Sequence, residues 1–212
     1  DSYANAHCVV GWTYYRWGNY DRSKYYLESG LALSQKTGNY SNVQLCYMFL
    51  GLIARQNKQY SESMRLIDTT LTFIEMPRDI DVYTLLLAEK GGLLLFENKP
   101  EEALPILNKA IELREAGNLP LVNFQGDFEG YFYLYQYFIL QKDWAKAEQL
   151  LLMTYDKAIT SKSNTQILKL NKELATFYNA KSKNNQALPY ALAYIILSDS
   201  LHIAENRFNV SQ

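Results

Sequence analysis

The chain has 212 residues, of which 48% are hydrophobic and 20% are charged, so it has ample apolar material for a buried core. Its formal net charge of -1 argues against a nucleic-acid partner, because a phosphate backbone selects a clearly basic protein face. The longest apolar runs, at 85–88 and 93–96, fall far short of the roughly 18 residues that span a bilayer, so direct membrane insertion is not expected.

A repeat organises the sequence. A small residue follows a tight turn at five points, and the steps between them are 40, 40, 44 and 40 residues: Ser23, Ser63, Ala103, Ala147 and Ala187. A fixed period of this size is typical of a solenoid, in which each unit buries its apolar face against its neighbours. We therefore expect one elongated domain of five helical pairs, with units at 4–40, 41–78, 79–120, 121–162 and 163–208.

In the first two units, turn and capping residues delimit the expected helices. Asp21 is expected to cap the second helix, and Ser41 and Ser61 the next two. The fourth helix is expected to run to Pro77, since proline cannot continue a helix. The first helix, at 4–17, is expected to face inward through Val9, Val10, Tyr14 and Trp17.

The later units carry clearer signals. Pro100 followed by two acidic residues predicts a helix start, where proline and the helix dipole both favour that order. The four extra residues of the fourth unit are assigned to 119–130, and the aromatic helix after them is expected to be sandwiched between neighbours. The last helix begins near Gln186 and is expected to be long and uncapped. Because the chain also begins at Asp1, we expect a fragment of a longer protein.

Each unit resembles a tetratricopeptide repeat (TPR). In that family a small residue lies where the first helix crosses the second, and an alanine lies early in the second helix. Gly11, Gly51, Gly91 and Ala175 match the first position, whereas Tyr135 departs from it. The resemblance implies an all-α, right-handed superhelical solenoid of about ten helices. The period is longer than the roughly 34 residues usual in the family. In this longer period the chain resembles the repeat arrays of bacterial signalling proteins.

The last helix, around 193–205, is similar to the final repeat of bacterial sensor histidine kinases with TPR input domains. That resemblance implies the sensory region of a signal-transduction protein, with a kinase elsewhere in the parent chain and a homodimer through the C-terminal helix as one way of signalling. It favours a periplasmic over a cytoplasmic location. The alternative is a TPR scaffold or peptide-binding domain of a transcription regulator.

The sequence shows no motif that is typical of catalysis. His7 and His202 are its two histidines, and no cluster of His, Cys or Asp has metal-ligand spacing. No glycine-rich phosphate-binding motif is present. We therefore expect no catalytic residue, metal or cofactor in this chain, and we do not expect it to be an enzyme.

The two cysteines, Cys8 and Cys46, occupy near-matching places in the first helices of the first two units. Their side chains are therefore expected to be neighbours. Two buried free thiols are the favoured interpretation, because free cysteine packs as a small hydrophobe, and a disulfide is the alternative.

A groove along the first helices that binds a protein or peptide is the functional hypothesis that the resemblance implies. Arginine and glutamine can bond to a carboxylate or backbone, and aromatic or methionine side chains can receive an apolar anchor. For apolar members such as Leu52, Leu95 and Phe132, packing between repeats is the favoured interpretation. The expected contact residues are Trp12, Tyr15, Arg16, Met48, Arg55, Gln56, Phe132, Gln136, Lys172 and Asn179.

Overall fold

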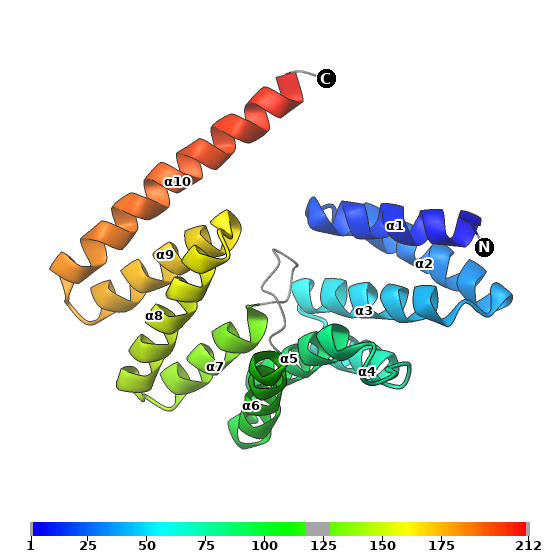
Figure 1. Ribbon diagram of the computed structural model, residues 1–212, viewed down its shortest axis with the longest axis horizontal. Helices are drawn as coiled ribbons and strands as arrows, with labels where there is room; N and C mark the ends of the chain where they lie inside the picture. Colours follow the sequence, from blue (N-terminus) through cyan, green and yellow to red (C-terminus); the bar gives the residue numbers. More distant parts are fainter. Residues whose placement is uncertain (1, 118–127, 211–212) are drawn as a thin grey trace. The chain divides into compact units, whose positions relative to one another are not determined.

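The computed structural model describes the backbone of residues 2–117 and 128–210, and side chains as far as residue 200 (Figure 1). All regular structure in these ranges is α-helical, which confirms the expected fold class. The ten helices are α1 (Ser2–Arg16), α2 (Tyr20–Thr37), α3 (Tyr40–Gln56), α4 (Tyr60–Leu71), α5 (Ile80–Phe96), α6 (Pro100–Ala116), α7 (Glu129–Leu140), α8 (Trp144–Thr160), α9 (Asn164–Ala180) and α10 (Asn184–Val210).

The chain divides into two compact units, Asp1–Asn118 and Leu119–Gln212. The N-terminal unit contains three helical hairpins, α1–α2, α3–α4 and α5–α6, and each hairpin packs against the next. The C-terminal unit contains the hairpins α7–α8 and α9–α10, which pack in the same way. Stacked consecutive hairpins are the solenoid arrangement that the repeat predicts. That all five hairpins form one domain stays a prediction.

The repeat of small residues marks the helix crossings. Ser23, Ser63, Ala103 and Ala147 are 0% exposed and Ala187 is 8% exposed. Each lies near the start of a second helix, where a larger side chain would hold the two helices of the hairpin apart. The small residues that repeat in the sequence are therefore the residues at which the two helices of each hairpin come close.

Glycine on the first helix brings the crossing closer still. A Cβ atom built on Gly91 would lie 2.5 Å from Cδ2 of Leu107, a side chain that is fully buried. A Cβ on Gly51 would lie 3.3 Å from Cγ1 of Ile67. In the two hairpins that carry serine, its hydroxyl also donates to the glycine carbonyl, at 2.7 Å from Ser23 and 2.8 Å from Ser63.

The turn inside each hairpin repeats with the same period. The residue that reverses the chain has positive φ in all five hairpins: 74° at Gly18, 59° at Lys58, 59° at Asn98, 58° at Lys142 and 57° at Ser182. Glycine takes up this left-handed conformation freely, whereas other residues do so at a cost. The turn geometry is therefore retained even where the residue is not glycine.

Three capping predictions were wrong. Asn19 and Asn39 cap α2 and α3, in place of Asp21 and Ser41, because each asparagine side chain accepts a hydrogen bond from the backbone N–H three residues later. Ser61 lies inside α4 and does not cap it.

The predicted inward stripe of α1 was wrong at three of its four residues, since only Tyr14 is half-buried. Val9, Val10 and Trp17 are 45%, 37% and 72% exposed. The crossing with α2 requires a small residue at Gly11, where an added Cβ would lie 2.7 Å from Cγ of Leu27, so the buried face is the one that contains this glycine. Its buried residues are Ala4, Cys8, Gly11 and Tyr15.

Helix α4 ends at Leu71, earlier than the predicted stop at Pro77. The hydroxyls of Thr69, Thr70 and Thr72 donate to backbone carbonyls three or four residues earlier, which competes with helix continuation. Most of the stretch 119–130, to which the extra residues of the fourth unit were assigned, lies outside the described residues. The predicted long last helix is confirmed, since α10 spans 27 residues.

Gly91→Ala is expected to lower the free energy of unfolding by about 2 kcal/mol, because the new methyl group overlaps a buried leucine. Gly51→Ala is the matched control. Its neighbours are farther away, and the gain in helix propensity, about 1 kcal/mol, offsets the crowding. Urea unfolding followed by circular dichroism measures the stability of both variants. A Gly91→Ala variant as stable as Gly51→Ala would contradict the close crossing at Gly91.

Candidate partner-binding site

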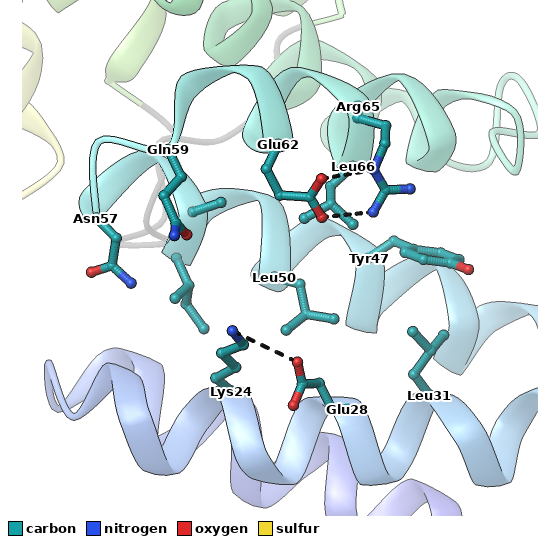
Figure 2. A pocket seen from close by; sticks show the side chains of 12 residues that line it. Lys24, Glu28, Leu31, Tyr47, Leu50, Asn57, Gln59, Glu62, Arg65 and Leu66 are labelled. Carbon is teal, nitrogen blue, oxygen red and sulfur yellow. Dashed lines mark hydrogen bonds and ion pairs between the residues drawn. The ribbon is translucent and has the colours of Figure 1, made fainter.

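A hollow of about 230 Å³ opens in the N-terminal unit between α2, α3 and α4 (Figure 2). Helices α2 and α4 lie on either side of it and α3 lies between them. The apolar lining is Leu31, Tyr47, Leu50, Ile53, Ala54 and Leu66, and the polar lining is Lys24, Glu28, Asn57, Gln59, Glu62 and Arg65.

Helical spacing explains how these side chains gather. On α2, Lys24, Glu28 and Leu31 lie four and three residues apart, so they share one face of the helix. On α4, Glu62 and Arg65 are three residues apart and share the facing side. Each second helix therefore presents one opposite-charge pair to the hollow.

The two charged pairs differ in geometry. Arg65 donates two hydrogen bonds to Glu62, Nε to Oε2 at 2.7 Å and Nη2 to Oε1 at 2.6 Å. These bonds lower the pKa of the Glu62 carboxyl below its ordinary value. Lys24 Nζ lies 3.9 Å from Glu28 Oε1. All four side chains are about half exposed, so solvent screens both pairs, and a partner of either sign can compete for them at small cost.

The ends of the hollow carry hydrogen-bonding groups. Asn57 and Gln59 lie together near one end, in the turn between α3 and α4 (Figure 2). Primary amides both donate and accept, which suits them to a peptide backbone. At Tyr47 the hydroxyl accepts a hydrogen bond from Gln35 Nε2 at 3.1 Å.

The residues predicted for a first-helix groove fall into three groups. Arg16, Gln56, Gln136, Lys172 and Asn179 are exposed, and Trp12 and Arg55 are half-buried. Tyr15, Met48 and Phe132 are 2%, 3% and 5% exposed and pack inside hydrophobic cores. With Leu52 at 2% and Leu95 at 7%, this burial agrees with the packing interpretation of the apolar members. That the exposed residues contact a partner stays a prediction.

Arg55, one of the predicted contact residues, forms an ion pair within the chain. Its Nε lies 2.8 Å from Oε2 of Glu89, so the ion pair joins α3 to α5, and the Glu89 side chain is only 1% exposed. Buried carboxylates require a nearby cation, and Arg55 supplies one from within the chain. This ion pair joins the second and third hairpins, and contact between Arg55 and a partner stays a prediction.

Two other predicted residues are brought together. The guanidinium carbon of Arg16 lies 5.4 Å from the ring centroid of Trp12, within the range of a cation–π contact. In the C-terminal unit, Lys169 Nζ lies 3.5 Å from the ring centroid of Phe132, so a lysine of α9 covers that aromatic side chain.

The sequence did not predict the hollow, because the expected contacts all lay on first helices. A usable signal was present. The second helices of the first two hairpins each carry an opposite-charge pair followed by a leucine, within 24–31 and 62–66. In the structure these charged pairs border the apolar lining of the hollow.

Within the described residues, no group of three or more His, Cys, Asp or Glu side chains is placed to hold a metal ion. In the same part of the chain, no helix combines the length and apolar character needed to cross a membrane.

No protein-family model matches this sequence, and no curated protein matches it. Solved structures do match. Aspartyl phosphate phosphatase F from Bacillus subtilis has a TM-score of 0.65 at 13% identity, over 92% of this chain and 59% of that protein. The apo form of RapI has a TM-score of 0.64 at 11% identity, over 95% of this chain and 85% of that one.

A kinesin light chain from Podosopora anserina with nearly identical TPR-like repeats has a TM-score of 0.58 at 15% identity, over 93% of this chain and 95% of that one. Compared with the phosphatase, the present chain spans less than two thirds of the length. At these identities the likeness concerns the fold, which is a TPR-like array of helical hairpins.

Arg55→Ala is expected to lower the free energy of unfolding by about 3 kcal/mol, because it removes the cation beside the buried Glu89 carboxylate. The double variant Arg55→Met/Glu89→Met is expected to recover most of that loss, since two apolar side chains replace the pair. Chemical unfolding of the two variants checks this. A double variant no more stable than Arg55→Ala would contradict the assignment.

Proposed function

We propose that this chain is a non-catalytic interaction domain that binds a protein or peptide, and that the hollow between α2, α3 and α4 receives a side chain of the partner. The size of the hollow carries this proposal. Sites for cofactors and drug-sized ligands usually occupy about 300–1,000 Å³. The hollow, at about 230 Å³, lies below that range and suits an apolar side chain with its flanking groups.

The lining indicates the chemistry of the partner. Leu50 and Leu66 offer an apolar contact, and the pairs Lys24–Glu28 and Glu62–Arg65 offer charge of both signs on the two sides. The amides at one end suit a peptide backbone. These groups together fit a segment with one apolar anchor flanked by charged residues, in which the anchor supplies most of the binding energy.

A second candidate surface is the first-helix face that the sequence predicts. The exposed Arg16 side chain lies over the ring of Trp12, and arginine and tryptophan are the residue types most enriched among energetically dominant contacts. This face and the hollow share α3, but Arg16 lies on α1 and Arg65 on α4, so substitutions at these two residues distinguish the surfaces.

The sensory role in bacterial signal transduction is the narrower form of this proposal. Two of the compared structures, a phosphatase and RapI, share the fold. None of the three compared structures is described as a sensor kinase, so the kinase input domain rests on the sequence alone. The alternative, a domain of a transcription regulator, likewise rests on the sequence alone.

The experiment uses an array of short synthetic peptides, each with one leucine, phenylalanine or methionine between a lysine and a glutamate. Peptides that bind the labelled chain are then titrated by fluorescence anisotropy. Arg65→Glu is expected to weaken binding by about tenfold or more, because it reverses one side of the rim.

Lys109→Glu is the matched control for Arg65→Glu. Lys109 is a similarly exposed cation in an i,i+3 pair, with Glu112, in the same unit and outside the hollow. Binding is expected to be unchanged in this variant. Binding that survives Arg65→Glu but is lost in Arg16→Ala would move the site to the first-helix face. An array in which no peptide binds would overturn the proposed function.

A further inference from the structure

The two cysteines of the chain meet inside the N-terminal unit. Cys8 on α1 and Cys46 on α3 have their Sγ atoms 3.1 Å apart, and both thiols are free. The side chains are 1% and 0% exposed. The prediction of two buried neighbouring free thiols is thus confirmed, and the closeness of the sulfur atoms raises the question of their chemistry.

The neighbouring helix holds this geometry in place. A Cβ atom built on Gly30 of α2 would lie 2.8 Å from Cys8 Sγ, so α2 packs directly behind the thiol and leaves it facing α3. A disulfide bond is about 2.05 Å long, so the two sulfur atoms need to approach by only about 1 Å. Two cysteines that served only as small apolar residues would not require this mutual orientation.

The two thiols differ in acidity. The hydrogen bond from Cys46 lowers the pKa of Cys8 to about 7, because it stabilises the Cys8 thiolate. The same hydrogen bond, together with burial, raises the pKa of Cys46. Near neutral pH about half of the Cys8 side chains are therefore thiolates, whereas Cys46 keeps its proton.

We propose that Cys8 and Cys46 form a reversible disulfide that covalently joins the first two hairpins when a hydroperoxide is present. The Cys8 thiolate attacks one oxygen of hydrogen peroxide, the O–O bond breaks, and the departing hydroxide takes a proton to become water. Cys46 then attacks the resulting sulfenic sulfur and displaces its hydroxyl group, which takes the Cys46 proton as a second water. In all, two thiols and one peroxide give one disulfide and two waters.

Access for the oxidant comes from local opening. Both thiols are buried, so peroxide reaches them when α1 separates briefly from α3. Segments of a fold open at a lower free energy than the whole unit, and peroxide is hardly larger than water. When α1 packs against α3 again, the sulfenic acid of Cys8 lies beside Cys46. This closeness favours the disulfide over further oxidation.

The test treats the reduced chain with hydrogen peroxide under native conditions and follows intact mass and iodoacetamide uptake. The expected product has lost two hydrogens, takes up no iodoacetamide, gives a Cys8–Cys46 cross-linked peptide, and is restored by dithiothreitol. Its melting temperature is expected to rise by several degrees, because the cross-link restricts the unfolded chain.

The initial rate supplies a second readout. Between about pH 6 and about pH 8 it is expected to rise about tenfold, as a thiol with a pKa near 7 ionises, against roughly eightyfold for an ordinary cysteine. Cys46→Ser is the matched control, and it is expected to stop at a sulfenic acid that dimedone traps, with no rise in melting temperature.

Three outcomes would overturn the proposal. In one, both thiols stay available to iodoacetamide on unfolding after peroxide treatment. In another, the disulfide joins two chains. In the third, Cys8 passes to the sulfinic acid while Cys46 stays reduced.

Discussion

The close crossing of two helices at a small residue is the contact on which each hairpin of the N-terminal unit depends. At Gly11 and Gly91 an added Cβ would lie less than 3 Å from a leucine of the partner helix, so the backbones approach as far as side chains allow. Such a crossing fixes the angle and register of the hairpin, and each hairpin then offers its neighbour a surface of defined shape.

The hollow and the thiol pair both follow from the stacking of these hairpins around α3. This helix packs against α1, α2 and α4, and ten of its seventeen residues are buried. The hollow borders it at the gap between α2 and α4 (Figure 2). Toward α1 it presents Cys46. Helix α3 thus supplies part of the lining of the candidate binding site and one cysteine of the proposed disulfide.

The repeat, the hairpins and the neighbouring cysteines could be predicted from the sequence, because period and turn residues are local signals. The inward face of α1 could not, since counting large apolar residues selected Val9 and Val10 where the crossing required Cys8 and Gly11. The ion pair of Arg55 could not be predicted either, because its carboxylate, Glu89, lies on another hairpin. Contacts between hairpins depend on how the hairpins stack. The hollow could not be predicted for the same reason, because residues of two hairpins line it.

The left-handed turn residues show how little this fold requires of residue identity at its turns. Glycine occupies that position once, and lysine, asparagine and serine occupy it in the other four hairpins. A geometry that accepts so many residue types constrains spacing far more than identity. Chains with few identical residues can therefore share one backbone arrangement, as this chain does with solved structures at 11–15% identity.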